Sequence, residues 1–250
     1  MIIHGNTFGI RINRAFTLSE VLITLGIIGV VAALTLPSLV NKYKLKQLEV
    51  AFKRNASIIE NAANDTAAHF GYSSFKDMGL LCQTGESQCP EVNKDYFTEI
   101  NNYFLSHFKI IKTIQGTDLY QFKYINYSGT AKNRAYHEII AVNGYTNPVS
   151  PNSTIHLLAD GTMVSNIGFF VHWLRHDGLT IAFDTNGPYK GPNRYGYDIF
   201  IYKTSPTVYS DCSSTDGLDV YQNGNGCYEH ALSGKNPDDD TKGYWDSLEF

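Results

Sequence analysis

The side chains best suited to acid–base or metal chemistry are His172 and His176, in the stretch "HWLRH", and His137, which precedes Glu138. His172 and His176 would share a face on a single helix or strand, which is one requirement of a metal site. Neither pair has the spacing of a known catalytic motif, and the chain contains no G-x-S-x-G, P-loop or H-E-x-x-H pattern. We therefore expect ordinary core or surface histidines, and a protein that is not an enzyme.

The four cysteines fall into two close pairs, Cys82 with Cys89 and Cys212 with Cys227. An even number of locally paired cysteines is typical of disulfides formed in an oxidising compartment. Zinc is the alternative, but neither pair has C-x-x-C spacing or neighbouring histidines at zinc-site spacing. The sequence predicts two disulfides outside the cytoplasm.

Composition indicates a folded chain without a nucleic-acid partner. The 250 residues are 43% hydrophobic and 13% aromatic, which is enough for a packed core. The net charge is −4, and no basic stripe follows the N-terminal region, whereas phosphate binding needs clustered Lys and Arg.

One carboxylate, Glu20, lies at the edge of an uncharged run, residues 21–40. About 20 apolar residues cross a bilayer as a helix, so we predict a membrane-spanning segment over residues 16–40. A secretory signal peptide is the alternative, with Arg11 and Arg14 as its basic region, but its apolar core would be shorter and followed by an A-x-A site. A carboxylate at this position is unfavourable unless it is paired or reaches the headgroups.

Beyond the apolar run we expect the helix to continue as an amphipathic extension over residues 41–70. Apolar side chains recur there at three-, four- and seven-residue steps. They are Leu45, Leu48, Phe52, Ile59, Ala63, Ala67 and Phe70. Gly71 is the expected end of the helix. Within the membrane half, Pro37 should bend or loosen the helix, and Gly26 and Gly29 permit close approach of neighbouring helices.

Residues 71–250 are rich in Tyr, Phe, Asn and Gly and are predicted to be β-rich. The candidate strands are residues 120–127, 136–142, 154–159, 179–183 and 198–202. Asp160–Gly161, between two apolar runs, predicts a hairpin turn. The expected fold class is α+β, with a long N-terminal helix packed on an antiparallel β-sheet.

The stretch "RAFTLSEVLITLGIIGVVAALTLP" resembles the N-terminal signal of type IV pilins and of the pseudopilins of type II secretion. The family pattern is a basic leader, a small residue, Phe, Thr-Leu, a Glu at the fifth mature position and an apolar helix. Here Ala15 occupies the position that is usually Gly, Phe16 follows, and Glu20 is fifth. Gly29 and Pro37 occupy the family's helix-loosening positions.

This resemblance implies that residues 1–15 are a leader, that prepilin peptidase cuts between Ala15 and Phe16, and that the new amine of Phe16 is methylated. It also implies that Glu20 pairs with the Phe16 amine of a neighbouring subunit during filament assembly. The implied partners are copies of the chain, other pilin-like subunits, the inner-membrane assembly platform, and lipid before assembly. The alternative is a single-pass anchored module that binds a glycan or peptide and does not polymerise.

The expected location is the bacterial inner membrane, crossed once, with residues 71–250 outside the cytoplasm, and then a periplasmic or extracellular filament. The charges conflict with this orientation, because Lys42, Lys44 and Lys46 follow the apolar run and outnumber Arg11 and Arg14 before it. We favour the orientation nevertheless, since large domains translocate largely regardless of charge and paired cysteines belong outside the cytoplasm.

The stretch "IAFDTNGPYKGPNRYGYDIF" also resembles the C-terminal part of pilin-like proteins, where a similar motif closes the sheet. A nearby loop binds calcium in related major pseudopilins, which makes Asp184, Asn186 and Asp198 candidate calcium ligands. The residues themselves favour a tight double turn, because calcium takes six or more oxygens and few are evident here.

Overall fold

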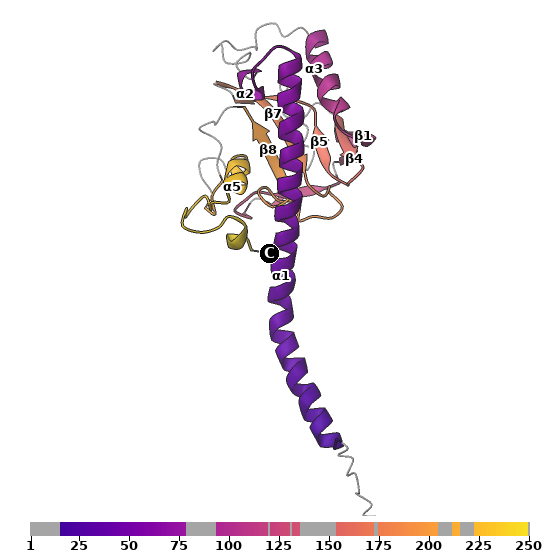
Figure 1. Ribbon diagram of the computed structural model, residues 1–250, viewed down its shortest axis with the longest axis vertical. Coiled ribbons are helices and arrows are strands. Elements are labelled where there is room, and N and C mark those ends of the chain that lie inside the picture. The colour runs from indigo at the N-terminus through magenta and orange to yellow at the C-terminus, as the bar shows by residue number, and fades with distance from the viewer. Residues whose placement is uncertain are drawn as a thin grey trace, which may run out of the picture. The chain divides into compact units, whose positions relative to one another are not determined.

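The computed structural model describes residues 16–78, 94–119, 121–130, 132–135, 154–172, 175–204, 212–215 and 223–249. The chain divides into two compact units, Met1–Tyr43 and Lys44–Phe250. The long helix α1 (Leu18–His69) contributes residues to both (Figure 1). Its bounds agree with the helix predicted over residues 16–70.

Helix α1 ends at His69, and Gly71 terminates it as predicted. Gly71 has φ 87°, in the left-handed region where a side chain is disfavoured. The N–H of Tyr72 donates to the carbonyl of Ala67 over 2.9 Å, and that of Gly71 to Ala68 over 3.1 Å. These two bonds form a Schellman motif, which satisfies carbonyls that the end of a helix would otherwise leave open.

The main sheet in the described residues has six strands, and every pairing is antiparallel. Strands β1, β4, β5 and β7 are neighbours in that order, and β6 and β8 both pair with β7. Their bounds are Ile110–Gln115 (β1), Thr154–Leu158 (β4), Met163–Ser165 (β5), Gly168–His172 (β6), Arg175–Asp184 (β7) and Ile199–Lys203 (β8).

Three predicted strands, residues 154–159, 179–183 and 198–202, are confirmed as β4, part of β7, and β8. The hairpin at Asp160–Gly161 is also confirmed, because β4 pairs with β5 and the N–H of Leu158 donates to the carbonyl of Thr162 over 2.8 Å. The prediction for residues 120–127 was too long, since among the described residues 121–127 only Lys123–Ile125 forms a strand (β2). Strand β2 pairs with β3 (Lys132–Ala135) in a separate sheet, and residues 136–142 lie outside the described residues.

The region predicted to be β-rich also contains helices. They are α2 (Phe75–Met78), α3 (Lys94–Ser106) and α5 (Cys227–Ser233), with 3-10 turns η2 (Gly116–Leu119) and η3 (Trp245–Ser247). Helix α3 buries Ile100 and Phe104, which are one helical turn apart. The sequence pattern in this part of the chain had suggested only strands.

The core lies between the C-terminal half of α1 and the sheet, and in Figure 1 this half crosses the strands. Phe52 is fully buried at its centre, with its ring centroid 4.3 Å from that of Phe200 and 5.6 Å from that of Trp245. The predicted apolar stripe is confirmed: Leu48, Phe52, Ile59, Ala63 and Ala67 are buried, and Leu45 and Phe70 are partly buried. The architecture is therefore α+β and pilin-like, as expected.

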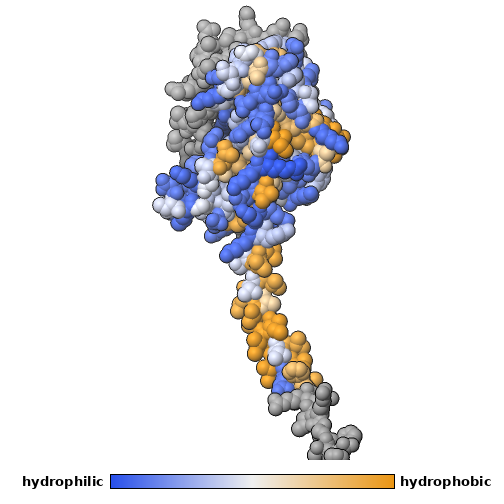
Figure 2. Space-filling model, in the orientation of Figure 1, coloured by the Kyte–Doolittle hydropathy of each residue, from blue (hydrophilic) through white to orange (hydrophobic). Residues whose placement is uncertain are grey.

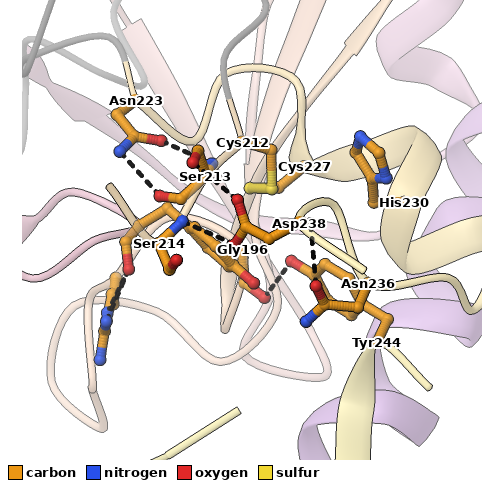
Figure 3. The surroundings of a disulfide bond; sticks show 12 residues. Gly196, Cys212, Ser213, Ser214, Asn223, Cys227, His230, Asn236, Asp238 and Tyr244 are labelled. Carbon is orange, nitrogen blue, oxygen red and sulfur yellow. Dashed lines mark hydrogen bonds between the residues drawn. A yellow bond between two sulfur atoms is a disulfide. The ribbon is translucent and has the colours of Figure 1, made fainter. Parts of the chain in front are cut away.

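A disulfide joins Cys212 to Cys227, the first residue of α5 (Figure 3). Beside it, the carboxylate of Asp238 accepts the hydroxyl of Ser213 over 2.7 Å and the N–H of Ser214 over 2.8 Å. The disulfide and these two hydrogen bonds therefore connect residues 212–214 to α5 and to the chain at Asp238. The predicted partners Cys82 and Cys89 lie outside the described residues.

Candidate functional site: the N-terminal part of α1

Residues 16–43, which are helical from Leu18, expose an apolar side chain at most positions, seen as orange atoms in Figure 2. The exposed large apolar residues include Phe16, Leu22, Ile23, Leu25, Ile27, Ile28, Val30, Leu34 and Leu39. Helix α1 is long and apolar enough here to cross a membrane, and no part of its apolar window is buried. Such a surface is unstable in water, so this segment is consistent with a single-pass membrane anchor.

Glu20 is the only charged residue in residues 16–41 and caps its own helix. Its Oε2 atom accepts the backbone N–H of Thr17 over 2.8 Å and the Thr17 hydroxyl over 2.9 Å. In return, the N–H of Glu20 donates to the Thr17 hydroxyl over 3.2 Å. This is a capping box, in which two backbone donors of the first turn find side-chain acceptors.

The capping box was missing from our sequence prediction, although the spacing Thr-x-x-Glu signals it directly. It holds the carboxylate at the N-terminal end of α1, where the helix dipole favours negative charge. The position adjoins Phe16, whose amine is the one that the predicted cut would expose. A carboxylate held at this place can accept hydrogen bonds within its own helix or pair with a cation brought by a neighbour.

Pro37 lies within α1, and the helix continues through it without an assigned break. Proline has no N–H, so the carbonyl of Ala33 lacks its usual donor. Local loosening at Pro37 therefore stays a prediction.

A Cβ atom added to Gly26 or Gly29 would meet nothing within 4 Å. Nothing in the described chain requires glycine at these two positions, and close approach of another helix stays a prediction.

The three candidate calcium ligands lie in one double turn between β7 and β8. Asp184 Oδ1 accepts the N–H groups of Asn186 and Gly187 over 2.9 and 2.8 Å. The two oxygens of Asp198 accept the N–H groups of Asn193 and Arg194 over 2.8 and 2.7 Å. These bonds give both carboxylates a direct structural role.

The oxygen atoms of this turn meet the ligand requirements of calcium only in part. Burial and the carboxylate of Asp184 raise the pKa of Asp198 well above its usual range, and a cation would oppose that shift. Within the described residues, the side-chain oxygens of Asn186 and Asn193 are buried without a donor. Calcium takes six or more oxygens, however, and the carboxylates are already engaged by backbone N–H groups. The geometry favours the structural turn, and calcium stays a prediction.

The histidine candidates do not form one site on a single element. His172 is the last residue of β6, and His176 lies in β7, where each pairs with a residue of the other strand. The expectation that they share a face of one element was therefore wrong. His137 and Glu138 lie outside the described residues. The described part of the chain holds no group of three or more His, Cys, Asp or Glu side chains that could bind a metal.

Comparison with protein families matches residues 10–36 to the prokaryotic N-terminal methylation motif. The matched segment includes Ala15, Phe16 and the capping box of Thr17 and Glu20. No curated protein and no solved structure matches the chain. The chain thus carries the N-terminal signal of type IV pilins and pseudopilins, and a pilin-like α+β fold follows it.

Proposed function

We propose that the protein is a structural subunit, a pilin or pseudopilin, that assembles through its N-terminal helix into a type IV pilus-like or type II secretion filament. The observation that carries this proposal is the methylation motif on a helix whose apolar surface is exposed at residues 16–43. A membrane anchor alone would need this surface, but it would not need the motif.

Prepilin peptidase would cut between Ala15 and Phe16 and methylate the amine of Phe16. Before assembly the helix lies in the inner membrane, with the domain of residues 44–250 outside the cytoplasm. The helix can leave lipid only if other apolar helices cover it, so the partners are copies of this chain or other pilin-like subunits at an inner-membrane assembly platform. The filament itself would be periplasmic or extracellular.

Glu20 has a specific role in this proposal. In the single chain its carboxylate is held by Thr17, which keeps it hydrogen-bonded within the membrane. A charge at this depth strongly favours an opposite charge, and cleavage creates one at Phe16. Pairing between Glu20 of one subunit and the Phe16 amine of the next would fix the axial register of the helices.

Mass spectrometry of the protein purified from a host with an active prepilin peptidase tests the processing step. We expect a mature chain that begins with methylated Phe16, and an uncut chain in a matched host that lacks the peptidase. An intact N-terminus in both hosts, or a cut near Val40, would contradict the proposal. Correct processing without filaments in electron micrographs would instead favour the anchored binding module.

A further inference from the structure

A cavity of about 400 Å³ opens among α1, α2, β8 and α5, entirely within residues 44–250. This volume lies in the range of small-ligand sites, about 300–1,000 Å³. Its lining includes the hydrogen-bonding side chains of Glu60, Lys76 and Glu229. They come from different elements, so the fold brings them together independently of the N-terminal helix segment.

One of these groups is already oriented. The hydroxyl of Tyr228, which also lines the cavity, donates to Oε1 of Glu60 over 2.7 Å and so holds that carboxylate in place. A carboxylate that is already held can accept a hydrogen bond from a ligand hydroxyl at a smaller cost in side-chain entropy.

The formal charges of the lining sum to zero, because it contains two lysines, Lys76 and Lys203, and two glutamates, Glu60 and Glu229. A cavity with no net formal charge gives little advantage to a ligand that is itself an ion. Carboxylates accept hydrogen bonds and ammonium groups donate them, so the matching ligand both donates and accepts.

The cavity also has an apolar surface beside these polar groups. Leu232 is 44% exposed, and the half-buried ring of Tyr202 packs against that of Tyr228 with centroids 5.2 Å apart. A ligand that carries hydroxyl groups around an apolar C–H face satisfies both surfaces at once. We propose that this cavity binds a saccharide ring, a role separate from filament assembly.

Saturation-transfer NMR on the mature chain tests the proposal, in lauryldimethylamine oxide micelles, whose headgroup is not a sugar. The probes are the methyl glycosides of glucose, galactose, mannose and N-acetylglucosamine. We expect at least one to receive saturation from the protein. Because Lys76 and Glu229 are exposed, Lys76→Ala and Glu229→Ala should remain folded and weaken binding about tenfold, through loss of one charged hydrogen bond each.

Leu232→Trp is the blocking variant, because it adds bulk at the cavity without removing a polar group. It should abolish saturation transfer. Glu99→Ala and Lys235→Ala, exposed residues of the same types outside the cavity, should leave the signal unchanged. The proposal is overturned if none of the four glycosides receives saturation, or if the signal persists in Leu232→Trp. Binding of the zwitterion betaine without any glycoside would also overturn it.

Discussion

The hydroxyl of Thr162 donates to Oδ1 of Asn55 over 3.1 Å, and both side chains are buried. The two residues are 107 positions apart and join the middle of α1 to the β4–β5 hairpin. On the surface beside them, Arg54 pairs with Asp160 over 3.2 Å. A buried bond and an exposed ion pair therefore connect the same two elements, and their energies should differ.

Asn55→Ala should lower the free energy of unfolding by about 1–3 kcal/mol, because the Thr162 hydroxyl loses its shorter bond and keeps only the carbonyl of Thr185, 3.4 Å away. Thr162→Val should cost at least as much, and the double variant less than the sum, since both changes remove the bond between Asn55 and Thr162. Chemical denaturation of the mature chain measures these values. The matched control is Arg54→Ala, which removes an exposed ion pair and should cost less than about 1 kcal/mol. Strict additivity of the buried pair would show that the bond does not couple the two residues.

The capping box predicts that Glu20 has two roles that substitution can separate. Glu20→Gln keeps a carbonyl that can cap the helix but removes the charge, whereas Thr17→Ala removes the hydroxyl of the cap but keeps the charge. We expect Glu20→Gln to abolish filaments and Thr17→Ala to reduce them, with Thr17→Ser restoring the wild-type level. Immunoblots of sheared filaments, normalised to mature protein in the membrane, measure assembly. Normal filaments from Glu20→Gln would show that capping suffices.

The buried His156 predicts a pH-dependent stability. Its Nδ1 lies 3.1 Å from the Thr113 hydroxyl, and its Nε2 lies 2.8 Å from Oδ1 of Asn166, an arrangement that satisfies a neutral ring. Burial lowers the pKa of His156 in the folded chain below its ordinary value of about 6.5. The unfolded chain therefore binds the proton more readily, and this contribution to stability is present above about pH 6.5 and lost as the pH falls below it.

The melting temperature of the wild type should consequently decrease on acidification from about pH 7.5 to about pH 5.5. His156→Gln cannot gain a proton on this side chain, so its melting temperature should fall less over the same interval. Scanning calorimetry at both pH values measures the difference. An equal fall in the two proteins would assign the pH dependence to other groups.

The double turn gives a direct test of calcium binding. If Asp184 and Asp198 serve only the turn, a chelator leaves the melting temperature of the mature chain unchanged. If they also hold calcium, the chelator lowers it and added calcium restores it, because a ligand that binds only the folded state stabilises that state. Asp240→Ala, at an exposed acidic position outside the turn, is the control and should leave the calcium response unchanged.

The sequence predicted the structure best where a regular pattern of residues had a single structural cause. The stripe that includes Leu48, Phe52 and Ile59 has helical spacing because it packs on a sheet, and the Asp160–Gly161 turn joins two strands that are adjacent in the chain. Helices α3 and α5 were not foreseen. Helix α5 has only 7 residues and begins at Cys227, so the disulfide and packing against β8 stabilise it more than its own sequence does.

The candidate site was only partly predictable for a different reason. The motif around Phe16 and Glu20 is local and could be read directly from the sequence. The bonds between Glu20 and Thr17 were overlooked because the carboxylate was interpreted as a partner for another chain or as a group that reaches the headgroups. The cavity near Glu60 depends on residues that are distant in sequence, such as Lys76 and Glu229, and no local pattern brings them together.

In the proposed filament, substitutions at Gly26 and Gly29 would separate the stability of the single chain from the stability of the assembly. Glycine costs a helix about 0.5–1 kcal/mol relative to alanine, and the open space around both positions shows no benefit within the chain. Alanine at either position would thus pass a screen for folding or membrane insertion and even score as an improvement. Under the proposed function, a selection that demands polymerisation would reject it, and tolerance measured on isolated subunits would then misidentify these residues as dispensable.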